Sequence, residues 1–293
     1  MPELPEVQTT VDGLNKTVVG RRIASVWTDW PKMFRDKSFS SFKKEVLGKK
    51  VLSASRRGKH VLINLSDDVT IIIHMKMTGH LLYGGWKLEG GSWKPKDKKG
   101  PLNDPFNRFV HVVFSLSNEK HLAFSDTRKF GKVVFAKTSE LAHSPHLAHL
   151  GPEPLNKNFD YEIFAERLSK KPRGKIKSVL MDQTIIAGIG NIYSDEMLWR
   201  AGIHPETKTE NIPAGKVREL FSAMKEVLRG GIEFGGDSMS DYRNIFGERG
   251  AFQERHRAYQ RKGAKCEKKN CGGIILRKVV GGRSAHFCPK HQK

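Results

Sequence analysis

The chain has 293 residues, 38% of them hydrophobic, which is enough for two or three folded domains and excludes an intrinsically disordered protein. Its 52 lysines and arginines exceed its 31 acidic residues, and the net charge of +21 predicts nucleic acid as the partner, with ribosome-associated or membrane-surface roles as alternatives. The longest apolar run, Val69 to His74, is too short to span a membrane, and the acidic start is unlike a signal peptide, so we expect a cytoplasmic protein, nucleoid-associated in a bacterium.

Residues 1–150 predict a β-rich domain with a leading helix. Residues 5–20 carry valine and leucine at helical spacing, begin at a proline and end at a glycine. The segment 84–105 is rich in glycine, lysine and proline, which is typical of a surface loop. Strand patterns occupy residues 51–65, 69–77 and 108–126, the last as a hairpin turning at 117–120.

The apolar period changes after the proline-containing stretch 149–155, which we interpret as a domain boundary. Residues 151–262 predict a helical domain. The glycine-bounded segment 235–252 has little periodicity and is expected to be a mobile loop. Helical patterns occupy residues 160–171, 175–183, 191–202 and 214–231. The fold class expected is therefore α+β and multidomain.

All three cysteines lie in the last segment, residues 263–293, in the pattern C-x4-C-x16-C-x2-H. Two short-spaced ligand pairs separated by a hairpin-length segment are what a tetrahedral zinc site requires. A module of this size cannot bury enough core by itself, so one structural Zn²⁺ would supply folding energy. The predicted ligands are Cys266, Cys271, Cys288 and His291; His286 is the alternative for the fourth position.

The start of the chain, MPELPEVQ, offers a reactive amine if Met1 is removed. A terminal α-amine titrates near 8, so a useful fraction of Pro2 would be neutral and nucleophilic at neutral pH. Attack of this secondary amine on a sugar C1′ would form an iminium ion, which acidifies the C2′ proton and permits β-elimination. Glu3 lies beside it as a candidate general acid. Met-Pro starts are common, however, and Pro-Glu is also an ordinary helix start.

Four motifs in order extend this hypothesis to the whole chain: PELPEV at the start, LGPEPL at the domain boundary, GIGNIYSDEMLWRAGIHP in the helical half and GGRSAHFCPKHQ near the end. This set resembles the formamidopyrimidine-DNA glycosylase family, bifunctional base-excision repair enzymes that remove oxidised purines. The resemblance implies a β-sandwich, a helix–two-turn–helix domain and a C-terminal β-hairpin zinc finger, with duplex DNA in the cleft between the lobes.

The resemblance also implies the catalytic residues. Pro2 would be the nucleophile and Glu3 the general acid, with Glu6 supporting the site. Lys59, in SRRGKHVLI, would contact phosphate and assist β-elimination. Arg283, in the finger, would grip phosphate and assist δ-elimination.

A base taken out of the stack leaves a hole, which apolar wedges and an arginine are suited to fill. By resemblance these are Met77 in HMKM, with Arg128 and Phe130 in SDTRKFG. Asn191 would hold phosphates at a helix N-terminus with Lys177 and Arg173, and the loop 235–252 would receive the flipped base. Without the resemblance, Met77 and Phe130 would be interpreted as core residues and Lys59 as a solvated strand-edge charge.

The sequence departs from the family pattern at three places. The first zinc knuckle is widened from C-x2-C to C-x4-C, and the last ligand is His291 in place of cysteine. The loop that usually reads D-P-R-R-F-G has lost its turn proline at Thr127. Phe109 stands where the family often has a DNA-contacting histidine, and His111 is expected to be only a strand residue.

Together with the resemblance, the terminal Pro2-Glu3, the wedge residues and the zinc finger predict a glycosylase and AP lyase. It would excise 8-oxoguanine and formamidopyrimidines from damaged double-stranded DNA and cleave the strand by β,δ-elimination. No nucleotide cofactor and no membrane are expected, and a single site needs only a monomer. The first alternative is the endonuclease VIII branch, which prefers oxidised pyrimidines and tends to start PEGPE; Leu4 favours the purine branch. A non-catalytic lesion-binding protein is the second alternative.

Overall fold

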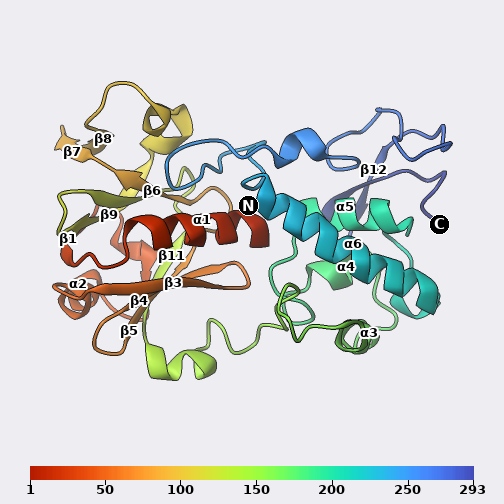
Figure 1. The fold of residues 1–293 in the computed structure, drawn as a ribbon, viewed down its shortest axis with the longest axis horizontal. Coiled ribbons are helices and arrows are strands. Elements are labelled where there is room, and N and C mark those ends of the chain that lie inside the picture. The colour runs from red at the N-terminus through yellow and green to blue at the C-terminus, as the bar shows by residue number, and fades with distance from the viewer. The chain divides into compact units, whose positions relative to one another are not determined.

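The computed structural model describes all residues, 1–293, and divides into two compact units. The first unit comprises residues 1–148 with 234–251, and the second comprises 149–233 with 252–293. The segment 234–251, which we placed in the helical part of the chain, therefore packs with the β-rich unit (Figure 1). The three-part division made from the sequence stays a prediction.

Two larger sheets make up most of the first unit, and apolar residues of both share one core. One sheet has the order β1-β9-β10-β6 and the other β2-β11-β5-β4-β3. Every pairing is antiparallel except that of β2 with β11. The strands are β1 (Ile23–Thr28), β2 (Phe34–Arg35), β3 (Val51–Arg57), β4 (His60–Leu65), β5 (Val69–His74), β6 (His80–Gly84), β9 (Val110–Leu116), β10 (His121–Ser125) and β11 (Lys132–Lys137).

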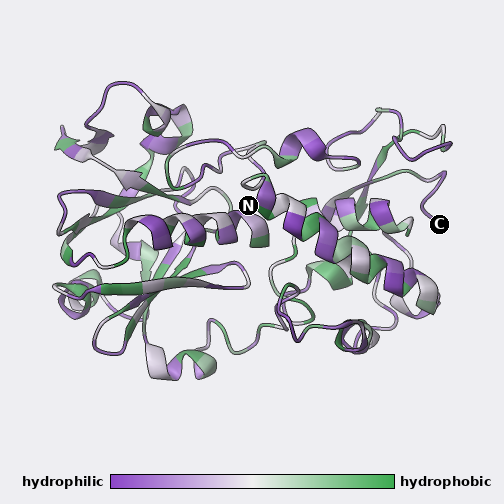
Figure 2. Ribbon diagram, in the orientation of Figure 1, coloured by the Kyte–Doolittle hydropathy of each residue, from purple (hydrophilic) through white to green (hydrophobic).

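Helix α1 (Leu4–Thr17) packs against β3 and β4, and its valines and leucines are buried. Hydrophobic and hydrophilic residues alternate along its ribbon (Figure 2). It ends three residues before the predicted stop, because the chain turns at Val18 and reaches Gly20 with φ of +83°. A second helix, α2 (Phe39–Val46), buries Phe42 in the same core. The hairpin predicted at 117–120 is present between β9 and β10.

The prediction that residues 84–105 form a loop was wrong in part. They contain a hairpin of β7 (Trp86–Glu89) and β8 (Ser92–Pro95), followed by two 3-10 turns, Pro101–Asn103 and Pro105–Arg108. Trp86 from this hairpin closes a second apolar cluster with Val113 and Ala123. The strands β9 and β10 are buried on both faces, and the hairpin supplies the cover that the outer face needs.

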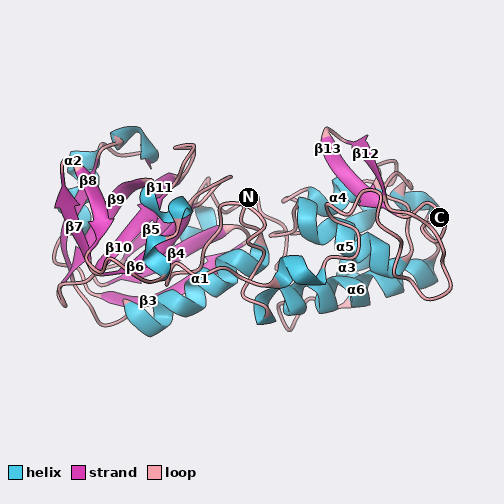
Figure 3. Ribbon diagram, turned by 90° about the horizontal axis from the view of Figure 1, so that it is seen from above, coloured by secondary structure: helices cyan, strands magenta, loops and turns pink.

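The second unit holds the remaining helices, in the predicted places, and one β-hairpin (Figure 3). Gly202, with φ of +70°, ends α5 in the left-handed conformation that a C-terminal glycine adopts at little cost. The elements are α3 (Tyr161–Ser169), α4 (Ile176–Met181), α5 (Asn191–Ala201), α6 (Ala214–Glu233), β12 (Leu276–Val280) and β13 (Arg283–Phe287). A β-rich first part, a helical second part and a C-terminal hairpin confirm the predicted fold class.

Candidate active site and nucleic-acid contacts

The first site element is the N-terminus of α1, where Pro2 and Glu3 are both buried. Glu3 is the extended N-cap of the helix, and its backbone N–H donates to Oε2 of Glu6 at 2.7 Å. The carboxylate of Glu6 therefore fixes the backbone of Glu3 relative to the first helical turn. Acidic groups are favoured at this end of a helix, because its unpaired N–H groups carry positive partial charge.

Glu6 also holds the loop 235–252. Its Oε1 accepts the N–H of Asp237 at 2.7 Å, and its backbone carbonyl accepts the hydroxyl of Tyr242 at 3.0 Å. Burial raises the pKa of Tyr242, which keeps the hydroxyl protonated as a donor. One carboxylate thus joins the candidate catalytic residues to a loop more than two hundred positions away in sequence. Asp237 and Tyr242 were not identified from the sequence, since nothing in the local pattern marks them.

Lys59 lies in the turn between β3 and β4 rather than within a strand, and only 5% of it is exposed. Next to this turn the rings of His60 and His74 meet edge to face, 4.5 Å apart. Burial, together with His60 and nearby lysines including Lys59, lowers the pKa of His74 to about 2. Its Nδ1 accepts the N–H of Lys76 at 3.0 Å, so the neutral ring carries its proton on Nε2. His74 is thus an uncharged donor that our sequence prediction missed.

The three predicted wedge residues lie on two loops that a single carboxylate joins. Met77, between β5 and β6, is half-buried, whereas Arg128 and Phe130, between β10 and β11, are exposed. Buried Asp126 accepts the hydroxyl of Thr78 from the first loop and the N–H groups of Arg128 and Gly131 from the second. The Arg128 guanidinium stacks over Phe130, with its Cζ 4.6 Å from the ring centroid. Asp126 therefore orders the loop that lacks the usual proline.

Two buried histidines of this unit predict a pH-dependent stability. The pKa of His74 is lowered to about 2, and burial lowers that of His80 to about 4, against 6.5 for a free histidine. A histidine whose pKa is lowered by folding contributes stability that is fully present above pH 6.5, its pKa in the unfolded chain. This stability is lost as the pH falls toward the pKa of the histidine in the folded protein. From pH 7 to pH 5 each histidine should remove about 2 kcal/mol of unfolding free energy.

Urea titrations across this range, on wild type and His74→Asn, measure the effect. The variant should lose about 2 kcal/mol of the change between pH 7 and pH 5. Substitution of the exposed His143 by glutamine should leave the change as in the wild type. A variant with the wild-type slope would contradict the assignment of His74 as a buried neutral ring.

The second unit carries its own group of predicted residues. Asn191 is the first residue of α5, and its buried Oδ1 has no hydrogen-bond partner. The turn before it is braced by Gln183, which accepts the N–H of Gly188 and donates to the carbonyl of Ile189. A helix N-terminus preceded by such a turn suits an oxyanion. Arg173 and Arg283 are exposed, the latter at the first position of β13.

Lys177 does not fit the predicted role of a phosphate contact. Its side chain is fully buried, and its ammonium donates to Asp195 at 2.6 Å, to the Ser194 hydroxyl at 3.1 Å and to the carbonyl of Asn191 at 3.2 Å. All three donor positions of the ammonium are engaged, which leaves none for DNA. The other carboxylate oxygen of Asp195 accepts from the backbone and ring of His286. Lys177 therefore supports α5 and the finger hairpin from within.

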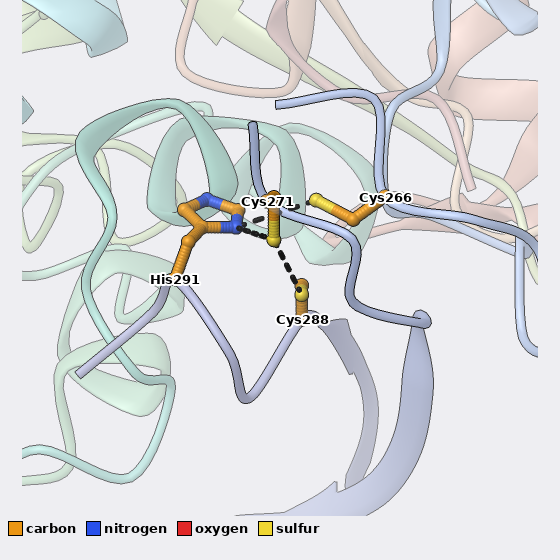
Figure 4. A group of neighbouring side chains, drawn as sticks. All are labelled: Cys266, Cys271, Cys288 and His291. Carbon is orange, nitrogen blue, oxygen red and sulfur yellow. Dashed lines mark hydrogen bonds between the residues drawn. The ribbon is translucent and has the colours of Figure 1, made fainter. Parts of the chain in front are cut away.

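Cys266, Cys271, Cys288 and His291 converge at the base of that hairpin (Figure 4). Their ligand atoms all lie within 4.8 Å of one another, and the Sγ atoms of Cys271 and Cys288 are 3.6 Å apart. Two sulfurs on one tetrahedral zinc lie about 3.8 Å apart, so the group fits that metal. His286 is not among the four residues whose ligand atoms converge, and its ring contacts Asp195, so the structure does not support it as the fourth ligand.

Two contacts from α5 orient this cluster. The indole N–H of Trp199 donates to Sγ of Cys266 at 3.3 Å. The backbone carbonyl of Trp199 lies 2.8 Å from Nε2 of His291. Burial lowers the pKa of His291, which favours the neutral ring. With Nε2–H directed at the carbonyl, Nδ1 is left toward the sulfurs as the ligand atom.

Models of the formamidopyrimidine-DNA glycosylase N-terminal domain and H2TH domain match residues 1–133 and 150–243. The chain belongs to the formamidopyrimidine-DNA glycosylase family. It is 38% identical over 293 residues to the enzyme of that name from Pelotomaculum thermopropionicum, covering 100% of this chain and 99% of the relative. A relative from Streptococcus pneumoniae is 37% identical over 295 residues, again covering 100% and 99%.

Solved glycosylase structures have the same fold. A Lactococcus lactis FPG mutant in complex with a Fapy-dG containing DNA superposes with a TM-score of 0.86 at 34% identity, covering 100% of both chains. MutM in complex with carbocyclic 8-oxo-G containing DNA gives 0.85 at 34% identity over the same coverage. In this family member, no helix is long and apolar enough to cross a bilayer.

Proposed function

We propose that this chain is a bifunctional DNA glycosylase and AP lyase of base-excision repair that acts on oxidised purines in duplex DNA. The observation that carries the proposal is the network in which Glu6 fixes both Glu3, beside Pro2, and the loop 235–252. The two DNA complexes named above, with Fapy-dG and with 8-oxo-G, support the purine substrate class.

In the proposed reaction the free amine of Pro2 attacks C1′ of the damaged nucleotide, and the bond from C1′ to the base breaks. The base leaves with the bonding electron pair and takes up the proton that the Pro2 nitrogen loses. Glu3 protonates the sugar ring oxygen as the ring opens, and the nitrogen lone pair completes an iminium ion. Loss of the C2′ proton then expels the 3′ phosphate. Lys59 is suited to hold that phosphate because it is a lysine in the turn between β3 and β4, the two strands that pack against α1. Arg283 assists the second, δ-elimination.

Met77, Arg128 and Phe130 are proposed to fill the space that the flipped nucleotide leaves. Their loops are already tied together by Asp126, so little ordering would be required on binding. The loop 235–252 receives the flipped base. In the second unit, Asn191 and Arg173 are proposed to hold flanking phosphates, while Lys177 acts as a positioning residue for the α5 N-terminus.

We propose one structural zinc on the three thiolates and Nδ1 of His291. The metal would hold the C-terminal hairpin and contribute folding free energy. His291→Ala is expected to lower zinc affinity by roughly 10- to 100-fold or more, whereas His286→Ala should keep one zinc per chain.

Chelator competition measures the zinc affinity of both variants. Cobalt substitution should give the visible spectrum of a tetrahedral site with three sulfurs and one nitrogen. Zinc lost from His286→Ala but kept by His291→Ala would overturn the ligand assignment.

Borohydride trapping tests the function, using wild-type protein and duplexes that carry 8-oxoguanine opposite cytosine, thymine glycol or an abasic site. A covalent adduct at Pro2 on the first duplex is expected, and peptide mass spectrometry would locate it. An adduct with thymine glycol but not with 8-oxoguanine would move the protein to the oxidised-pyrimidine branch. No adduct on any duplex, with Pro2 confirmed as the first residue, would leave a lesion-binding protein.

A further inference from the structure

The loop 235–252 is anchored by a segment that begins inside the predicted surface loop 84–105 and runs past its end. This segment, residues 101–108, comprises the two 3-10 turns that follow the β7–β8 hairpin. Residues 235–251 and 101–108 belong to the first unit (Figure 1). They contact each other through the polar side chains of Arg243 and Asn107. None of these contacts enters the proposed chemistry.

Arg243 is the centre of the contact. Only 4% of its side chain is exposed, and its Nε donates to the carboxylate of Asp104 at 2.9 Å. One terminal nitrogen donates to the backbone carbonyls of Ser240 at 3.0 Å and Tyr242 at 2.8 Å. Its Cζ lies 4.9 Å from the ring centroid of Phe106. The planar guanidinium thus joins the carboxylate of Asp104, which lies outside the loop, to two backbone carbonyls within it. Lysine cannot reproduce this geometry.

A second anchor lies a few residues further along the loop. Fully buried Asn107 bonds Nε2 of His80 at 2.9 Å and donates to the carbonyl of Gly247 at 3.4 Å. Gly247 has φ of +85°, and a Cβ there would lie 2.8 Å from the Asn107 amide nitrogen, so only glycine allows this approach. The N–H of Tyr83 also donates to the carbonyl of Ile245 at 2.6 Å.

The anchors divide the loop into a fixed arm and an open turn. Residues 242–247 are held by β6 and by residues 101–108, and Asp237 is held by Glu6. Between them, Met239 and Ser240 are exposed, with 42% of Met239 accessible. The open turn, residues 238–242, therefore follows Asp237, which Glu6 holds, and precedes Arg243. Its backbone path depends on both anchors.

We infer that Arg243, clamped by Asp104, is a positioning residue that sets the shape of the turn 238–242 for reading the flipped base. The inference rests on the proposed function, because that function assigns the loop to the base. Excision requires the base to be bound in the correct geometry, whereas cleavage at an existing abasic site involves no base. Loss of Arg243 should therefore separate the two activities.

Single-turnover assays on an 8-oxoguanine duplex and an abasic duplex test this inference with Arg243→Met, Arg243→Lys and Asp104→Asn. We expect Arg243→Met to lower excision by about 10- to 100-fold, since small misplacements of positioning groups have effects of this size. Cleavage of the abasic duplex should change by less than about threefold. Asp104→Asn should show a smaller effect of the same kind, non-additive with Arg243→Met because the two residues share one contact.

Arg22→Met is the matched control, since exposed Arg22 of the same unit also donates to a backbone carbonyl, that of Gly48. Equal losses on both duplexes, or no loss on either, would overturn the inference. Failure of the proposed function is distinguishable, because it appears in the wild type. If the wild type excises another lesion of the trapping panel instead, the same comparison is made with that lesion.

Discussion

Pro2→Gly is expected to reduce cleavage of a lesion duplex by about 10³-fold or more, the scale on which loss of a catalytic nucleophile is measured in other enzymes. Glycine keeps a terminal amine but makes it primary and flexible, so it loses both the secondary iminium and the fixed approach from the start of α1. The buried position of Pro2 beside Glu3 means that a misdirected amine has little freedom to compensate. Single-turnover cleavage and borohydride trapping measure the effect together.

Glu3→Gln serves as the companion variant. It removes the acid while keeping the size of the side chain and its backbone bond to Glu6. Excision should fall by about 10²- to 10⁴-fold, as for other general acids, with Pro2 still free to form an adduct at an abasic site. Wild-type cleavage by Pro2→Gly, with the N-terminus verified, would refute the terminal-amine mechanism.

Lys177→Met is expected to destabilise the protein by about 3–5 kcal/mol, since it leaves the carboxylate of Asp195 buried without its cation. Asp195 also accepts from His286, so the loss should loosen α5 and the finger hairpin together. Chemical denaturation measures the change. The double variant Lys177→Met with Asp195→Leu should be less destabilised than the sum of the single variants, because it removes both charges.

Lys175→Met is the matched control. Lys175 lies two positions away, is about half exposed and pairs with Glu206, so its loss should change stability by no more than about 1 kcal/mol. If Lys177 instead contacted phosphate, Lys177→Met would leave stability unchanged. The substitution would instead weaken DNA binding and lower the slope of log affinity against log salt concentration by about 1. That result would restore the prediction made from the sequence.

The sequence by itself determined the class of fold and the family. Helix spacing of apolar residues located α1 and the four helices of the second unit, and the cysteine spacing located the cluster of three cysteines and His291. These signals are local, because a helix or a zinc knuckle is specified by residues a few positions apart. The roles of Pro2 and Glu3 stay predictions: the adjacent residues suggest the chemistry, and the family resemblance assigns it.

Only the tertiary structure decided which charged groups are buried and what they hold. Lys177 and Lys175 are the same residue type two positions apart, yet Lys177 is buried against Asp195 whereas Lys175 is about half exposed and pairs with Glu206. The hairpin within residues 84–105 was not predicted because its Trp86 packs on a face of a sheet, and that face exists only once the strands have assembled. Glu6, Asp104 and Arg243 owe their roles to partners up to 236 positions away. Such contacts follow from packing and from the need to pair buried polar groups, neither of which a local pattern records.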